Sequence, residues 1–180
     1  MEEVSLIQML DARERRVHHQ QELLARYGKP LVCFTMNIAG PVKDTPLIRR
    51  GFARGRQLLE RQFLRCRWTP LSTDVSRAVT GCEAFYVLDA SPLEIKRLTT
   101  LVEDASPLGR LFDMDVLCPD GRKVDREELQ LEGRRCLLCG GPAKVCSSRR
   151  VHTVAALQEK TTEILTRTFT ELDAATAAQQ

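Results

Sequence analysis

Residues 106–118 read SPLGRLFDMDVLC, and this stretch decides the fold. Pro107 and Gly109 predict a turn, and the apolar run after them, interrupted by two aspartates, predicts a strand. The side chains of a strand alternate between its two faces, so every second residue of the run shares a face. The face that suits a core is wholly apolar and carries Phe112, Met114, Val116 and Cys118. The opposite face carries Leu111, Asp113, Asp115 and Leu117.

Two carboxylates, Asp113 and Asp115, thus lie side by side on the second face. The rise of a strand places their backbones roughly 7 Å apart. Aspartate is unfavourable in strands, and neighbouring like charges repel each other unless a cation lies between them. Magnesium binds through one or two carboxylates together with substrate phosphate oxygens, so the pair predicts a magnesium site. The alternative is a half-exposed strand whose outer face is simply acidic.

The composition is typical of a globular protein. The 180 residues are 43% hydrophobic and 28% charged, which suits a single domain over residues 1–180. The formal net charge of +3 is too small to predict bulk nucleic-acid binding, so an anion site must come from local clustering. No apolar run approaches the roughly 20 residues of a membrane span, and the acidic N-terminus is unlike a secretory signal. Seven cysteines, an odd number, favour a reducing cytoplasm over a disulfide framework.

The N-terminal segment, residues 1–28, predicts a long amphipathic helix. Residues 5–27 lack glycine and proline, and Gly28 supplies a stop. Its apolar residues at helical spacing are Leu6, Leu10, Val17 and Leu24. Three arginines and two histidines crowd the middle, at positions 13, 15, 16, 18 and 19. This basic cluster is either a solvated helix face or a surface that meets a phosphate or an acidic partner.

A strand at residues 31–38 runs through a Gly-Pro turn into a helix at about residues 46–63. Asp44 or Thr45 can cap this helix, whose two glycines favour either tight packing on the sheet or room for a ligand. Lys43, Arg49 and Arg50 surround its first turns. Because a helix N-terminus offers free N–H groups and partial positive charge, we expect an anion site here, although the glycine spacing of a P-loop is absent.

The remaining elements alternate. Residues 65–81 predict a loop, residues 84–89 a strand, and residues 91–104 a helix opened by Ser-Pro. A tight turn at residues 119–121 predicts a hairpin with a short return strand. Residues from about 151 to 172 predict a C-terminal helix that frays into the tail. The C-terminal helix and tail together are assigned to residues 153–180. This order predicts an α+β or α/β fold, with a single mixed β-sheet and packed helices.

A cysteine-rich segment occupies residues 134–152. Cys136 and Cys139 form a CxxC pair, and Cys146 and His152 follow. Three thiolates and an imidazole can form a structural zinc site, and the Gly-Gly-Pro turn after the pair suits a chelate loop. The second CxxC of a zinc ribbon is missing, so buried free thiols or a redox-sensitive pair are the alternatives.

Three motifs together resemble a known family: GPVKD (residues 40–44) with the arginines after it, PLGRLFDMDV (107–116), and RRCLLC (134–139) with a later cysteine and histidine. They are similar to apo-citrate lyase phosphoribosyl-dephospho-CoA transferase, also called holo-citrate lyase synthase, from about Leu31 to His152. The resemblance implies a nucleotidyltransferase. Its donor is triphosphoribosyl-dephospho-CoA, its acceptor is a serine of the acyl carrier protein (gamma) subunit of citrate lyase, and pyrophosphate leaves. A nucleotidyltransferase-like fold stays open, because the Gly-Ser pair that usually lies well before the D-x-D is not found here.

The residues agree with the reaction that the resemblance implies. Transfer at the α-phosphorus of a triphosphate requires charge neutralisation more than a covalent intermediate. Magnesium held by Asp113 and Asp115 is expected to bridge the reacting phosphate and to lower the pKa of the serine hydroxyl. The cations expected at the departing pyrophosphate and at the donor's other phosphates are Arg110, Lys43, Arg49 and Arg50.

A zinc-stabilised module that binds RNA or DNA is the second interpretation. It would use the arginines around the cysteines, which are Arg134, Arg135, Arg149 and Arg150. One tryptophan, two tyrosines and a small net charge argue against it, because single-strand binders stack bases on aromatic side chains. For the transferase we expect neither nucleic acid nor a membrane as a partner.

Overall fold

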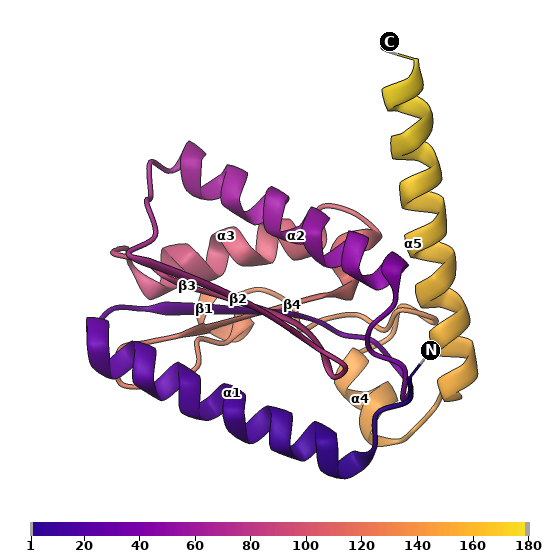
Figure 1. Ribbon diagram of the computed structural model, residues 1–180, viewed down its shortest axis with the longest axis horizontal. Coiled ribbons are helices and arrows are strands. Elements are labelled where there is room, and N and C mark those ends of the chain that lie inside the picture. The colour runs from indigo at the N-terminus through magenta and orange to yellow at the C-terminus, as the bar shows by residue number, and fades with distance from the viewer. Residues whose placement is uncertain (1, 179–180) are drawn as a thin grey trace.

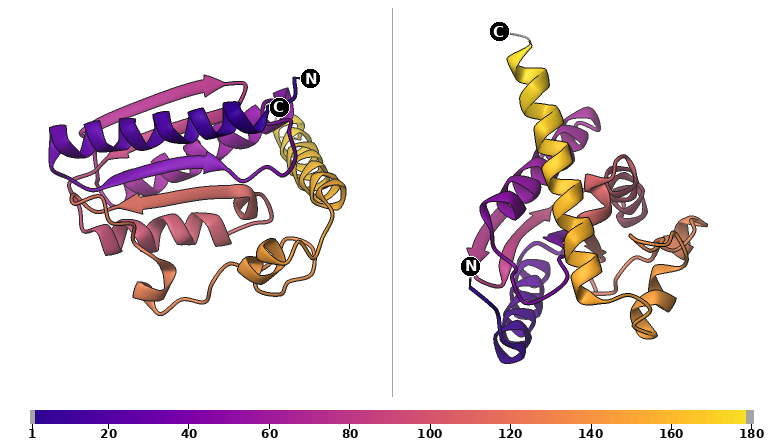
Figure 2. Two further views of the ribbon diagram at one scale, coloured as in Figure 1. Left: turned by 90° about the horizontal axis from the view of Figure 1, so that it is seen from below. Right: turned by 90° about the vertical axis from the view of Figure 1, so that its right-hand side faces the viewer.

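The computed structural model describes residues 2–178. Its strands are β1 (Leu31–Met36), β2 (Ser72–Ala78), β3 (Gly81–Val87) and β4 (Phe112–Leu117). Its helices are α1 (Leu6–Tyr27), α2 (Pro46–Arg65), α3 (Pro92–Asp104), α4 (Ala143–Ser148) and α5 (Val154–Ala177), with short 3-10 helices η1 (Leu108–Leu111) and η2 (Arg126–Leu129). The strands form one sheet in the order β2-β3-β1-β4. α1 covers one face, α2 and α3 cover the other, and α5 stands at one end (Figure 1, Figure 2).

The predicted α+β fold is confirmed. The sheet is antiparallel throughout, whereas the prediction was a mixed sheet. All three neighbouring strand pairs are antiparallel. Part of the difference lies in residues 65–81, which the sequence predicts as a loop. Within them, β2 forms a hairpin with β3 and becomes an edge strand. All seven residues of β2 are exposed or half-buried, so the apolar alternation that identifies a strand is absent.

The apolar face predicted for β4 packs in the main core, between the sheet and the helix pair α2 and α3. Phe112 and Met114 are fully buried there. Gly55 allows α2 to approach closely, because a Cβ at this position would lie 2.5 Å from the ring of Phe34 and 2.9 Å from the ring of Phe112. A Cβ at Gly51 would lie 2.7 Å from a side chain of α5. Tight packing therefore explains both glycines of α2.

Helix α1 has the predicted extent but presents a different face to the sheet. Gly28 ends it in the left-handed conformation, at φ +58°. Leu6, Leu10 and Val17, which the spacing predicts to be buried, are 74%, 47% and 50% exposed. Leu24 is buried, in a second apolar cluster between the end of α1 and the sheet. In the earlier turns of α1, Met9, Arg13 and Arg16 line a hollow that belongs to the candidate site.

The segment after β4 only partly matches the predicted hairpin. The turn at residues 119–121 is present, with the N–H of Gly121 donating to the carbonyl of Cys118 at 2.9 Å. The expected return strand is a single bridge between Leu117 and Lys123. The chain then runs along the outer edge of β4 to α4 (Figure 2). α5 continues to Ala177, past the predicted end, and residues 179–180 lie outside the described residues.

Within residues 2–178, every helix is too short or too polar to cross a membrane.

Candidate active site

The two aspartates of β4 lie on the α1 side of the sheet, as the alternation predicts. Asp113 pairs in register with Thr35 of β1, and Asp115 pairs with Cys33. Both side chains are partly exposed, 47% for Asp113 and 32% for Asp115. β4 is an edge strand, and a cavity of about 850 Å³ lies beside these carboxylates.

Each aspartate has one cation beside it. The Nζ atom of Lys123 lies 2.6 Å from Asp115 Oδ1, and an Nη atom of Arg134 lies 3.8 Å from Asp113 Oδ1. Burial, and after it the charge of Asp115, raises the pKa of Asp113. Burial disfavours the charge of Lys123, but its hydrogen bond to Asp115 outweighs this effect and raises the pKa of Lys123. The ionised form of Asp113 is therefore less favourable than that of an ordinary aspartate.

Two buried charged residues of α3 hold the outer edge of β4. Glu103, 2% exposed, accepts the N–H of Met114 at 2.9 Å, and Lys96, 5% exposed, donates to the carbonyl of Met114 at 3.2 Å. Glu103 also binds Arg126 and Arg134, each at 2.7 Å. The sequence reasoning missed this pair. Its signal is the polar stripe at positions 96, 99, 100 and 103, whose helical spacing places polar side chains on the buried face of α3.

Glu103 is not available as a third metal ligand, because all of its contacts are with nitrogen donors. Arg134 in turn donates to the carbonyl of Phe112 and so ties the connection after η2 to the start of β4. The side chains that orient the aspartates thus come from α3 and from the segment that precedes the cysteines.

A small cavity of about 160 Å³ lies between α1 and the ends of β1 and β4. Arg13 and Arg16 line it from α1, Lys43 lines it from the loop before α2, and Asp113 lines it from β4. The Nζ of Lys43 donates to the carbonyl of Ile38. Burial, and after it the charge of Arg13, lowers the pKa of Lys43. The structure therefore brings Lys43 and Asp113 to one cavity. Arg13 and Arg16, two arginines of the basic cluster predicted in the N-terminal helix, line the same cavity.

The other two cations predicted around the start of α2 point elsewhere. Thr45 caps the helix, accepting the N–H of Ile48 at 3.1 Å. Arg49 lies 3.2 Å from Asp44, which also accepts two hydrogen bonds from Arg77. The Nη2 of Arg50 lies 2.8 Å from Asp173 of α5, and its guanidinium lies over the ring of Phe169 at 4.3 Å. The expected three-cation cluster is thus divided, and only Lys43 faces the aspartates.

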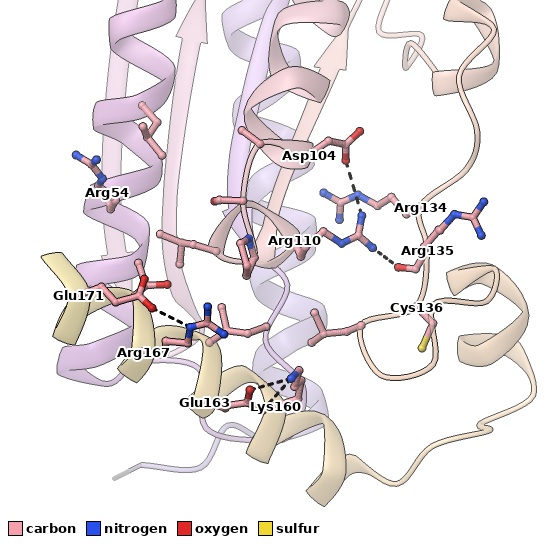
Figure 3. A pocket seen from close by; sticks show the side chains of 18 of the residues that line it. Arg54, Asp104, Arg110, Arg134, Arg135, Cys136, Lys160, Glu163, Arg167 and Glu171 are labelled. Atoms are coloured by element: carbon pink, nitrogen blue, oxygen red, sulfur yellow. Dashed lines mark hydrogen bonds and ion pairs between the residues drawn. The ribbon is translucent and has the colours of Figure 1, made fainter.

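Arg110 lies in a much larger cavity, of about 1370 Å³, between α2, α5, η1 and residues 131–137 (Figure 3). It donates to the carbonyl of Arg135 and lies 3.7 Å from Asp104. The walls mix apolar side chains with cations, most of which have a carboxylate partner, as Figure 3 shows for Arg167 with Glu171. Arg110 therefore borders the site from the side away from the small cavity.

Arg134 and Arg135 connect these spaces. Both line the large cavity of Figure 3, the cavity around Asp113 and Asp115, and a third cavity beside the cysteines. Asp113 in turn belongs both to the aspartate cavity and to the small cavity under α1. The cavities thus follow one another, from α1 past the aspartates and the two arginines to α5.

The four predicted metal ligands of the cysteine-rich segment converge. The Sγ atoms of Cys136, Cys139 and Cys146 and a ring nitrogen of His152 all lie within 4.8 Å of one another. Cys139 Sγ is 3.5 Å from Cys146 Sγ and 3.4 Å from His152 Nε2. Gly140, at φ +71°, turns the chain after the CxxC pair. This cluster could hold one metal ion, and within residues 2–178 it is the one group of three or more such ligands that comes together.

Comparison with known proteins gives the family of this site. The family model of apo-citrate lyase phosphoribosyl-dephospho-CoA transferase matches residues 4–168. The chain belongs to this family. The matched region includes every candidate residue, from Lys43 to His152, so the aspartates, the cations and the cysteine cluster are all part of the family's sequence region.

Individual relatives agree with the family model. A Vibrio cholerae protein named probable apo-citrate lyase phosphoribosyl-dephospho-CoA transferase is 38% identical over 162 residues, which cover 89% of this chain and 91% of that protein. A Citrobacter koseri protein of that name, without "probable", is 35% identical over 154 residues, covering 86% and 84% of the two chains. An Escherichia coli protein of the same name is 33% identical over 162 residues, covering 90% and 88%. These names do not favour the nucleic-acid module.

Proposed function

We propose that this protein transfers phosphoribosyl-dephospho-CoA to apo-citrate lyase. The donor is triphosphoribosyl-dephospho-CoA, the acceptor is a serine of the acyl carrier protein subunit, and pyrophosphate is released. The observation that carries the proposal is the family match over residues 4–168. The succession of cavities supports it, because the donor is long and carries a triphosphate at one end and the dephospho-CoA arm at the other.

The chemistry of Asp113 and Asp115 suits magnesium. Both carboxylates project from one face of β4, and the raised pKa of Asp113 supports the proposal, because a divalent cation would stabilise the ionised form. Two protein carboxylates leave positions for phosphate oxygens and water, as magnesium prefers. When bound, magnesium neutralises charge on the oxygens of the transferred phosphate. Lys123 and Arg134 hold the carboxylates from either side.

The donor would lie along the cavities with its α-phosphorus near the aspartates. Lys43 and Arg110, which border the site from opposite ends, contact its charged groups. The cavity of about 1370 Å³ in Figure 3 has the volume and the mixed apolar and basic walls that a dephospho-CoA arm requires. We do not assign Arg49 and Arg50 to the donor, because Arg49 forms an ion pair with Asp44 in the loop before α2 and Arg50 forms one with Asp173 of α5.

For the cysteine cluster we propose a structural zinc ion. Three thiolates and one imidazole form a closed, four-ligand set with no position left for a substrate. Such a site would hold the segment of residues 136–152 together, and with it the backbone of Arg134 and Arg135 just before it. None of the seven cysteines, all within residues 2–178, forms a disulfide, which suits the reducing cytoplasm in which we place the protein.

The direct test combines the purified protein, magnesium, the donor and the apo form of the acyl carrier protein subunit. Mass spectrometry of the carrier should show an added phosphoribosyl-dephospho-CoA group. A carrier whose acceptor serine is replaced by alanine is the matched control and should keep its mass. If the wild-type carrier stays unmodified under these conditions, the proposed function is refuted.

A further inference from the structure

In its first three turns, helix α1 exposes two large apolar side chains, Leu6 and Leu10, and places two arginines at the small cavity. Met9, Arg13 and Arg16 follow one another at i, i+4 and i+7, the spacing of a single helix face, and all three line the small cavity. Leu6 and Leu10 are 74% and 47% exposed, whereas Ala12 is buried. Helix α1 therefore brings two arginines to a cavity that Asp113 also lines.

The cations that line this cavity are only partly neutralised by the chain; Arg13 is exposed, and Arg16 and Lys43 are half-buried. Arg16 forms an ion pair with Glu83 at 2.6 Å. Within residues 2–178, Arg13 and Lys43 have no carboxylate within ion-pair distance, and Lys43 is bound to a backbone carbonyl instead. Burial, followed by the charge of Arg13, lowers the pKa of Lys43. Two unpaired cations on one cavity are therefore mutually unfavourable until an anion lies between them.

The neighbouring residues define which anion fits. Asp113 forms part of the same cavity, so its contents lie next to the proposed magnesium carboxylates. The cavity, about 160 Å³, is much smaller than the cavity of about 1370 Å³ beside α5, so it suits a small anion better than a nucleoside. Thr35 and Asn37 add polar side chains to the wall. A short inorganic polyphosphate has the matching size, charge and distance from the metal site.

We propose that the cavity under α1, with Arg13 and Lys43, binds the terminal diphosphate of the donor. The diphosphate stays bound there as pyrophosphate after its bond to the α-phosphate breaks. This assignment rests on the proposed function for the identity of the donor. In the transfer step the serine oxygen bonds to the α-phosphorus, and the bond between that phosphorus and the oxygen bridging to the β-phosphorus breaks. The electron pair stays on pyrophosphate, and the serine proton passes to solvent. Arg13 and Lys43 stabilise the added charge on pyrophosphate.

The test uses inorganic pyrophosphate with magnesium and measures its binding by titration calorimetry. Arg13→Ala and Lys43→Ala should each raise the dissociation constant at least about tenfold, the usual cost of one charge-assisted hydrogen bond. Arg15→Ala is the matched control. Arg15 is also an exposed arginine, but it lies two residues further on and thus on another side of α1, so binding should change less than about twofold.

Equal binding of pyrophosphate by wild type, Arg13→Ala and Arg15→Ala would overturn the assignment. The same holds if Arg15→Ala weakens binding as much as Arg13→Ala, since the effect would then be general charge. Circular dichroism melting of each variant separates lost binding from lost folding, and Arg13→Met and Lys43→Met keep the aliphatic stems if the alanine variants unfold. Pyrophosphate binding does not require the carrier. If the wild-type protein binds pyrophosphate and the variants bind it more weakly, but no transfer to the carrier occurs, the proposed function alone is refuted. If the wild-type protein transfers the group normally and the variants bind pyrophosphate as the wild type does, this inference alone is refuted.

Discussion

Glu103 is the residue whose loss should damage the site most without contact with substrate. Its carboxylate is 2% exposed and has three partners: the N–H of Met114 at 2.9 Å, and Arg126 and Arg134 at 2.7 Å each. Glu103→Ala leaves a buried N–H without an acceptor and two arginines without their common anion. Removing one partner of a buried, hydrogen-bonded charge pair costs about 3–5 kcal/mol.

The lower end of that range applies here. The side chains of Arg126 and Arg134 are 12% and 23% exposed, so both recover part of their hydration when the carboxylate is gone. About 3 kcal/mol in a chain of this length corresponds to a fall in melting temperature of about 6–12 °C. Glu103→Gln keeps an acceptor for Met114 and loses only the charge, so its fall should be about half as large.

Thermal unfolding followed by circular dichroism measures these shifts. Glu94→Ala is the control, since Glu94 is an exposed glutamate in the first turn of the same helix, and its loss should cost no more than about 1–2 °C through the helix dipole. If Glu103→Ala melts within the range of Glu94→Ala, the edge of β4 does not depend on Glu103. The account of how the aspartates are positioned would then fail.

Three further predictions concern the chemistry. Asp113→Asn should reduce transfer at least about a hundredfold and also raise the melting temperature at neutral pH. The sign follows from the raised pKa of Asp113: its ionised form is less favourable in the folded than in the unfolded chain, so stability is lost as pH rises above the ordinary carboxyl pKa, and the amide removes that loss. Arg110→Ala should lower turnover at saturating donor, whereas a change confined to KM for the carrier would place Arg110 on the docking surface. The purified protein should contain about one equivalent of zinc, and a strong chelator or Cys139→Ser should lower its melting temperature; metal-free protein with full activity would contradict this.

What the sequence predicted best was local. The alternation around Asp113 placed one apolar face in the core and both aspartates on the other, because the period of a strand leaves no third arrangement. Gly28 was correctly predicted to end α1, and Thr45 is one of the two residues predicted to cap α2, since capping depends on side-chain and backbone chemistry within a few residues. The convergence of the cysteine cluster also followed from spacing within one short segment.

What the sequence could not provide was the orientation of elements toward distant neighbours. α1 has apolar residues on more than one side, and the choice of inward face depends on what lies beneath it. Leu24 meets an apolar part of the sheet, whereas Arg13 and Arg16 meet a hollow lined by Lys43 and Asp113. Arg50 was misplaced for the same reason, because its partners lie on α5, more than a hundred residues away.

The position of the aspartates on an edge strand explains why charged residues surround it. A central strand would leave no room beside the aspartates for a long donor and a carrier protein, but an edge strand exposes backbone groups that invite pairing with other chains. Here side chains occupy those groups: Lys96 and Glu103 bind Met114, and Arg134 binds the carbonyl of Phe112. The edge is thus satisfied without a further strand. Arg134 also lies 3.8 Å from Asp113, so one of the side chains that protect the edge also contacts a carboxylate of the proposed magnesium site.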